Sequence, residues 1–192
     1  MTKKEWTPTV NDLSYYPLLK EALDETKGTV IECGTGHGST PPLHKYCVES
    51  ARMLYSFETD VNWLKKFEHF NEATHKLWLI SDWRDVHTNH SSADVIFVDH
   101  APGEDRKLMI TDFLDTKGII VVHDTELGQA DHGYRVRALF KNFKYVVEVR
   151  TNGAWANALS NEIDITKWIG KKYGEFEITK YDPTLKSDRI DD

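Results

Sequence analysis

The sequence predicts an α/β fold: a single doubly wound, mostly parallel seven-stranded sheet with helices on both faces and an antiparallel C-terminal hairpin. Short apolar runs alternate along the chain with segments whose apolar residues recur at helical spacing. The apolar runs are continuous, which is typical of strands buried on both faces of a parallel sheet. The Asn152-Gly153 turn separates the last two runs and indicates the hairpin.

Each strand is expected at one apolar run. The strands are expected in order at 29–33, 53–57, 77–80, 94–98, 118–122, 145–149 and 154–160. The helices are expected from about 14 to 27, at 41–50, after Asp60, at 104–115 and at 134–141, with 84–93 as a loop or short helix. In the first helix, Leu18, Leu19 and Leu23 share one face, and Gly28 is a typical stop signal. This strand-helix order predicts a parallel sheet whose ligands bind at the carboxyl ends of the strands.

Length and charge narrow the class of protein. The 192 residues favour one domain over 1–192, with an N-terminal arm over 1–12 and a frayed tail over 183–192. The net charge of -7 does not favour nonspecific binding to nucleic acid. No apolar run approaches the length of a membrane span, and no apolar signal core follows the N-terminus. We therefore expect a cytoplasmic protein without a membrane partner, in which Cys33 and Cys47 are small buried thiols.

A glycine-rich turn follows the first expected strand. Gly34, Gly36 and Gly38 stand at alternate positions, and Ser39 and Thr40 can begin a helix. Amides at the start of that helix would face a ligand. The third glycine of the dinucleotide fingerprint would fall at position 39, so the spacing disfavours a nicotinamide cofactor. A tight turn without any ligand is the alternative interpretation.

Acidic residues stand at the ends of five successive strands. They are Glu32, Glu58, Asp82, Asp99 and Asp124. One acid after a strand is ordinary turn or capping chemistry. Five at the same edge of a sheet predict an acidic crevice that suits a ligand with a cation, ribose hydroxyls and an amino group.

The pattern Glu-x-Gly-x-Gly-x-Gly over 32–38 resembles the first motif of class I S-adenosylmethionine (SAM) methyltransferases, and the resemblance covers about 28–160. It implies SAM as cofactor. The positions it assigns to cofactor binding are Glu32, Gly34, Thr35, Gly36, Gly38, Ser39, Glu58, Asp82, Trp83 and Asp99. Among them, Glu58 matches the acid that binds the ribose hydroxyls, with Asp60 as its rival. Asp82 matches the acid that receives the adenine amino group, and Trp83 is either a wall for the adenine or a core tryptophan.

The run Val98-Asp-His100, with Asp105-Arg106 soon after, is similar to small-molecule O-methyltransferases of the catechol type. That resemblance implies Mg²⁺ held by Asp99 and Asp124. Thr125 stands where the family has asparagine, and the base lysine is missing, so a site without metal is the competing interpretation. Without a metal, His123 and His100, which both end strands at the crevice, are the candidate bases, and Asp124 is expected with them among the catalytic residues.

The expected function is SAM-dependent methyl transfer to a small-molecule acceptor, through oxygen or nitrogen. Two alternatives share the fold: a SAM-binding protein without methyltransferase activity, and another SAM-using enzyme such as an aminopropyltransferase or a lyase. His37, inside the glycine turn, is interpreted as a loop residue with an exposed edge.

Overall fold

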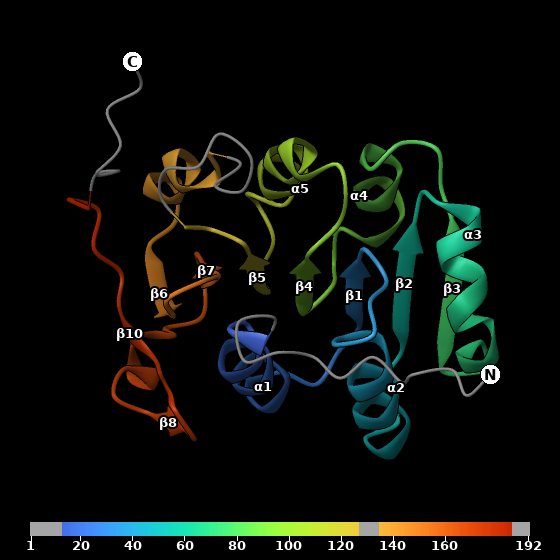
Figure 1. The fold of residues 1–192 in the computed structure, drawn as a ribbon, viewed down its shortest axis with the longest axis horizontal. Helices are drawn as coiled ribbons and strands as arrows, with labels where there is room; N and C mark the ends of the chain where they lie inside the picture. The colour runs from blue at the N-terminus through green and yellow to red at the C-terminus, as the bar shows by residue number, and fades with distance from the viewer. Residues whose placement is uncertain (1–12, 127–134, 186–192) are drawn as a thin grey trace.

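The computed structural model describes residues 13–126 and 135–185, which form a sheet between two layers of helices (Figure 1). The expected arm over 1–12 and most of the expected tail, 186–192, lie outside the described residues. Helices α1 and α2 cover one face of the sheet, and α4 and α5 cover the other. None of the helices in the described ranges is long and apolar enough to cross a membrane.

The helices and strands alternate through most of the chain. The strands are β1 (Val30–Cys33), β2 (Leu54–Glu58), β3 (His75–Leu79), β4 (Val95–Val98), β5 (Ile119–His123), β6 (Tyr145–Arg150), β7 (Trp155–Ser160), β8 (Lys172–Tyr173), β9 (Phe176–Glu177) and β10 (Thr179–Lys180). The α-helices are α1 (Tyr16–Glu25), α2 (Thr40–Glu49), α3 (Val61–Leu64), α4 (Arg84–His90) and α5 (Arg106–Asp112). The 3₁₀ helices are η2 (Lys65–Phe70), η3 (Gly103–Asp105), η4 (Val136–Asn142) and η5 (Thr166–Trp168).

The main sheet has the order β10-β6-β7-β5-β4-β1-β2-β3. Strands β1 to β5 pair in parallel, and β7 is antiparallel to both of its neighbours, β5 and β6. This confirms the predicted doubly wound sheet with its hairpin. The short strand β10 adds an eighth strand at the edge, and β8 and β9 form a separate two-stranded sheet. Strands of two residues are too short to show a period in the sequence.

The register aligns the carboxyl ends of the central strands. Val30 of β1 pairs with Leu54 of β2 on one side and with Val95 of β4 on the other. Because β1 lies between β2 and β4 while the chain order reverses there, a crevice opens at this switch point. The residues that follow β1, β2, β4 and β5 therefore meet at one edge of the sheet.

Successive residues of each central strand enter opposite halves of the core. Val30 and Val95 pack with apolar residues of α1 and α2, whereas Ile31 and Ile96 pack with residues of α4 and α5 such as Met109. Burial on both faces explains why these strands are continuous apolar runs rather than alternating ones.

Several helices are shorter or tighter than predicted. The expected helix over 104–115 is a 3₁₀ turn followed by α5, and the one over 134–141 is the 3₁₀ helix η4. The helix after Asp60 is a single α-helical turn that continues as η2, and the Asp60 carboxylate caps it by accepting the amides of Asn62 and Trp63. The segment 84–93 contains the short helix α4.

Candidate functional site

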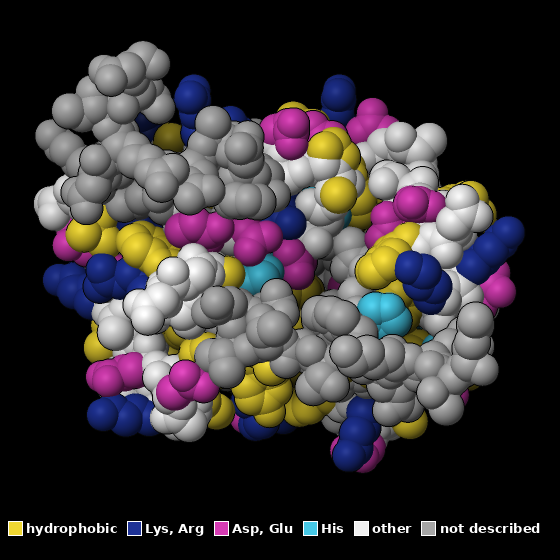
Figure 2. All heavy atoms as spheres, in the orientation of Figure 1, with side chains coloured by type: hydrophobic (Ala, Val, Ile, Leu, Met, Phe, Trp, Pro, Cys, Tyr) yellow, Lys and Arg dark blue, Asp and Glu magenta, His cyan; other side chains and the backbone are white. Residues whose placement is uncertain are grey.

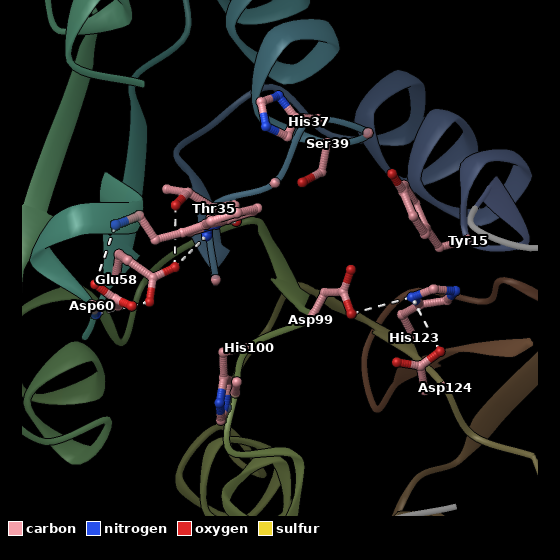
Figure 3. A pocket seen from close by; sticks show the side chains of 15 residues that line it. Tyr15, Thr35, His37, Ser39, Glu58, Asp60, Asp99, His100, His123 and Asp124 are labelled. Carbon is pink, nitrogen blue, oxygen red and sulfur yellow. Dashed lines mark hydrogen bonds and ion pairs between the residues drawn. The ribbon is translucent and has the colours of Figure 1, made fainter. Parts of the chain in front are cut away.

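A cleft of about 710 Å³ opens at the carboxyl ends of β1, β2, β4 and β5. The glycine turn at 34–39 lines one wall, and the start of α3 extends it. Asp99, His123 and Asp124 line the opposite end, beneath Tyr15 (Figure 3). Figure 2 shows acidic side chains and histidine around a hollow in this face of the molecule. The structure thus brings most of the predicted site residues to one place.

Gly34 is the residue of the turn whose backbone demands glycine. Its φ is +94°, and a Cβ there would lie 2.6 Å from the Cα of His100 and 2.7 Å from the carbonyl oxygen of Asp99. A Cβ at Gly36 would meet only the Ser39 hydroxyl, at 3.3 Å. Gly34 therefore lets β1 and the end of β4 approach closely, and this contact shapes the floor of the cleft.

Glu32 lies beneath the turn and does not line the cleft. Its carboxylate is completely buried and accepts hydrogen bonds from the hydroxyls of Ser39 at 2.6 Å, Thr40 at 2.9 Å and Ser56 at 2.6 Å. Burial raises the pKa of Glu32 to about 7, against the opposing effect of these hydrogen bonds. Through these hydrogen bonds Glu32 ties the turn to β2, and its direct contact with a cofactor stays a prediction.

Glu58 lies in the cleft, as expected from the sequence. One carboxylate oxygen accepts the amide and the hydroxyl of Thr35, both at 3.1 Å. The other accepts the amides of Thr59 at 2.8 Å and Asp60 at 3.1 Å. Asp60 also lines the cleft, although one of its oxygens is used to cap α3. Glu58 and Asp60, the two residues predicted as alternatives for the ribose contact, thus both line the cleft, and Glu58 is the more buried of the two.

Trp63 is a cleft residue that sequence reasoning missed. Its indole nitrogen donates to the Thr35 carbonyl oxygen at 2.6 Å, which joins α3 to the glycine turn. The imidazole of His37 meets this indole edge to face, with ring centroids 5.5 Å apart. The sequence did offer a signal for this position. Trp63 lies about one helical turn after the capping residue Asp60 and close to the end of β2, where cleft residues are expected.

Asp82 and Trp83 are not among the described residues that line the cleft, so their predicted contact with adenine gains no support from its lining. Asp82 is exposed, and its carboxylate accepts the Arg84 amide at 3.0 Å. Trp83 is only 3% exposed and stacks on the ring of His100, with centroids 3.9 Å apart. The core interpretation of Trp83 is therefore right, because α4 begins here and carries the indole inward.

His100 is likewise removed from the chemistry predicted for it. His100 is among the residues that line the cleft, but its ring is buried and turned away from Asp99 (Figure 3). Burial and the nearby positive charge of Arg106 lower the pKa of His100 to about 3. A neutral ring stacked on Trp83 does not favour proton uptake from a substrate, so the role of His100 as a base stays a prediction that this geometry does not support.

Asp99, His123 and Asp124 converge at the end of the cleft opposite the start of α3 (Figure 3). The Nδ1 atom of His123 lies 3.2 Å from one Asp99 oxygen and 3.5 Å from one Asp124 oxygen. Burial lowers the pKa of His123, but the two carboxylates outweigh burial and raise it above its usual range. Burial raises the pKa of Asp99, whereas His123 and Arg106 outweigh burial and lower it. The cluster is therefore built to hold an imidazolium between two carboxylates.

Arg106 completes this cluster from behind the cleft wall. Its guanidinium lies 3.1 Å from an Asp99 oxygen and 3.0 Å from an Asp124 oxygen. It also donates to the carbonyl oxygens of His100 and His123, each at 2.9 Å. Arg106 belongs to a motif noted in the sequence, but no role was predicted for it. Its two acidic partners follow different strands, so the pairing is not visible in the sequence.

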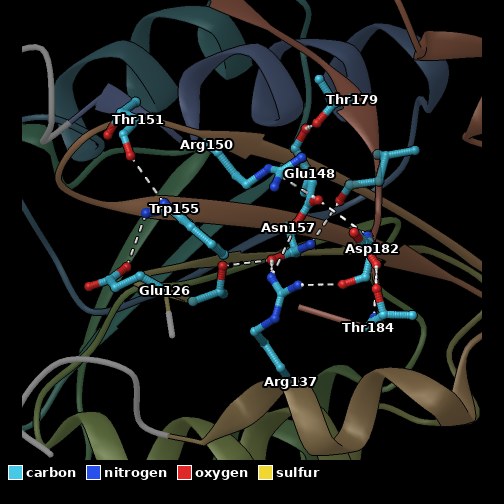
Figure 4. Close-up of polar contacts among 12 residues, drawn as sticks. Glu126, Arg137, Glu148, Arg150, Thr151, Trp155, Asn157, Thr179, Asp182 and Thr184 are labelled. Carbon is cyan, nitrogen blue, oxygen red and sulfur yellow. Dashed lines mark hydrogen bonds and ion pairs between the residues drawn. The ribbon is translucent and has the colours of Figure 1, made fainter. Parts of the chain in front are cut away.

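A second polar cluster, on β6 and β7, serves the fold (Figure 4). The buried Glu148 carboxylate pairs with Arg137 at 3.1 Å and with Arg150 at 3.3 Å. Arg137 also donates to the carbonyl oxygen of Asp182, and the hydroxyl of Thr179 donates to that of Glu148. This cluster fastens the last strand, β10, to the sheet.

Comparisons with known proteins show the fold. No protein-family model and no curated protein sequence matches the chain. A Klebsiella pneumoniae protein assigned as an O-methyltransferase is similar in structure, with a TM-score of 0.62 and 14% identity over 80% of this chain and 82% of that chain. The N-terminal domain of human METTL16 has a TM-score of 0.56 and 16% identity over 82% of this chain and 73% of that one. A spermidine synthase in complex with the transition-state analogue AdoDATO has a TM-score of 0.57 and 17% identity over 82% and 62%, respectively. This chain therefore has the Rossmann-like fold of class I SAM-dependent methyltransferases.

Proposed function

We propose that this chain transfers a methyl group from SAM to the oxygen or nitrogen of a small-molecule acceptor. The observation that carries the proposal is the continuous cleft that joins the glycine turn and Glu58 to the cluster of Asp99, His123 and Asp124. Its volume of about 710 Å³ is in the range of small-molecule sites. One end offers contacts for a nucleoside and the other offers ionisable groups for an acceptor.

The nucleoside end consists of the glycine turn, Glu58 and Trp63. Backbone amides of the turn lie at the start of α2, where they favour polar or negative ligand groups. A carboxylate such as Glu58 accepts hydrogen bonds from two ribose hydroxyls well. Trp63 and His37 supply the aromatic surface beside the adenine, in place of the predicted Asp82 and Trp83.

The acceptor end consists of the proton-holding cluster. Bound SAM would supply a methyl carbon made electrophilic by the adjoining sulfonium. The task of the chain is then to position the acceptor and to take up its proton. The neutral form of His123 is the group we assign to take up that proton, and its Nδ1 faces Asp99 and Asp124. The carboxylates stabilise the imidazolium that forms, which is the physical meaning of the raised pKa of His123.

Calorimetric titration and single-turnover transfer test this proposal. SAM or S-adenosylhomocysteine should bind more tightly than NAD and should raise the melting temperature, since each binds only the folded chain. Labelled SAM and a panel of small alcohols, phenols and amines then test the transfer. Tighter binding of NAD would overturn the cofactor assignment. SAM binding without transfer across the panel would favour the non-catalytic alternative.

Aminopropyl transfer is the second candidate, and the composition of the cleft favours it. None of the described residues that line the cleft is a lysine or an arginine. The carboxylate of intact SAM therefore meets no lysine or arginine from this lining, whereas decarboxylated SAM has no such carboxylate. A spermidine synthase has a similar fold, and this similarity is a second reason to test aminopropyl transfer. Comparing the affinities for SAM and decarboxylated SAM, and weighing the product by mass spectrometry, separates the two reactions.

A further inference from the structure

We infer that Arg106 takes the place of a divalent metal in this site and acts as a positioning residue for Asp99 and Asp124. Which cation the two carboxylates hold does not depend on whether the chain transfers a methyl group. With Arg106 in this place, the site without metal is favoured over the Mg²⁺ site.

The carboxylates by themselves would suit a metal. One ligand atom from each of Asp99, His123 and Asp124 lies within 4.8 Å of the others. Mg²⁺ prefers oxygen ligands and is often bound by one or two carboxylates. The spacing is therefore compatible with a shared cation.

The guanidinium of Arg106 is that cation. Its two terminal nitrogens divide between the carboxylates, with Nη2 3.1 Å from Asp99 and Nη1 3.0 Å from Asp124. A guanidinium is planar and permanently charged, so it can bridge two carboxylates in a fixed geometry. One fixed charge thus neutralises part of the repulsion between two acids that end neighbouring strands.

Arg106 is also anchored where it lies. The side chain is almost completely buried and donates to the carbonyl oxygens of His100 and His123. Turning it away from the acids would break these bonds and leave buried carbonyl groups unpaired, which is costly. A divalent cation between the acids would therefore have to bind next to a positive charge that has no easy way to leave.

Thr125, which stands where the family has asparagine, does not turn toward the two carboxylates. The Thr125 hydroxyl is buried and donates to the side chain of Asn157 at 2.6 Å. The remaining member of the group, His123, directs Nδ1 at the same Asp99 oxygen that Arg106 contacts. The residues present therefore do not fit Mg²⁺, and they fit a guanidinium.

Mn²⁺ binding, measured by the relaxation rate of water protons, tests the inference without an activity assay. The wild-type chain should show no binding in the micromolar range. Arg106→Gln removes the charge and frees both carboxylates, so its affinity for Mn²⁺ should rise by about tenfold or more. Adding Asp124→Asn to that variant should abolish the gain and so locate the ion.

Arg52→Gln is the matched control. Arg52 is also buried, but it donates to the carbonyl oxygens of Leu23, Thr26 and Gly28 and to one hydroxyl, with no carboxylate among these contacts. This variant should gain no Mn²⁺ affinity. Circular dichroism identifies which variants fold, and the wild-type titration tests the inference even where a variant does not. Micromolar Mn²⁺ binding by the wild type that Asp124→Asn removes would overturn the inference, as would a folded Arg106→Gln variant without any gain.

Discussion

Replacing Glu32 by glutamine should remove the loss of folding stability that wild type suffers as the pH rises and this buried carboxyl ionises. The carboxyl group is completely buried beneath the glycine turn and accepts hydrogen bonds from the hydroxyls of Ser39, Thr40 and Ser56. Glutamine has nearly the same shape and can both accept from and donate to hydroxyl groups, so Glu32→Gln should keep the network. The substitution therefore removes the charge with little change of packing.

The sign follows from the direction of the pKa shift. Burial raises the pKa of Glu32 from its ordinary 4.5 to about 7, so the folded chain binds this proton more tightly than the unfolded chain. The stabilisation is fully present below the unfolded pKa and is lost as the pH rises through the folded pKa. At about 1.4 kcal/mol for each pH unit between the two pKa values, the loss amounts to about 3 kcal/mol, most of it between pH 5 and pH 8. The free energy of unfolding of Glu32→Gln, relative to wild type, should rise by that amount over this interval.

His75 changes the free energy of unfolding with pH in the direction opposite to Glu32. The effect of Glu32 therefore has to be measured as a difference between Glu32→Gln and wild type. Its ring nitrogen lies 2.9 Å from the Ser56 hydroxyl, and burial lowers the pKa of His75 to about 4. A group with a lowered pKa contributes stability above its unfolded pKa of 6.5 and loses it as the pH falls toward 4. In the wild type the two groups offset each other over much of this range. Of these two groups, only His75 still titrates in Glu32→Gln, so the pair then contributes stability that rises with pH.

Urea unfolding monitored by circular dichroism at pH 5, 6, 7 and 8 measures this effect. Glu49→Gln, at an exposed position of α2, is the control for the same substitution outside the network. A constant difference between Glu32→Gln and wild type across the four pH values would refute the reasoning, because Glu32 would then be equally ionised in the folded and unfolded chains.

Three further predictions address the site. Gly34→Ala should lower the free energy of unfolding by about 2 kcal/mol or more, measured by urea unfolding, because φ is +94° and a Cβ would meet backbone atoms at 2.6 Å; unchanged stability would contradict the strain. Glu58→Ala should weaken SAM binding by about 1–3 kcal/mol in calorimetry, whereas Asp82→Ala, outside the cleft, should bind like wild type; equal losses would return Asp82 to the site. His123→Ala should lower kcat by roughly 10²-fold with SAM affinity kept, and Asp99→Asn should lower kcat in the same direction; full activity in both variants would exclude the cluster from the chemistry.

Local sequence patterns determined the fold and the end of the cleft formed by the glycine turn and Glu58. The continuous apolar runs of β1, β4 and β5 require burial on both faces, and this alone implies a parallel sheet between helices. The glycine turn and Glu58 were found because their position depends only on where a strand ends. Parallel strands in register bring such positions to the same edge whatever the rest of the chain does.

Only the tertiary structure decided which strand-end residues face the cleft. Glu32 and Glu58 look alike in the sequence, but Glu32 enters the layer beneath the turn while Glu58 reaches the cavity floor. Trp83 and Trp63 are also alike in type. Trp83 stands at the start of α4 and stacks on the buried ring of His100. Trp63 lies in α3, which Asp60 caps, and its indole donates to Thr35 on the cleft wall.

Arg106 shows the physical limit of sequence reasoning most clearly. The sequence shows that Arg106 is charged, but it does not show which acids it pairs with. Its partners Asp99 and Asp124 follow two different strands, and neither lies in the same helix as Arg106. Whether two such acids hold a metal or a guanidinium depends on the reach and direction of one side chain in the assembled core. The sequence determined which ionisable groups gather at the crevice, because strand ends follow from local patterns. The pairing among those groups was decided by the packing of α5 against the sheet, because ion-pair geometry is a property of distances in space.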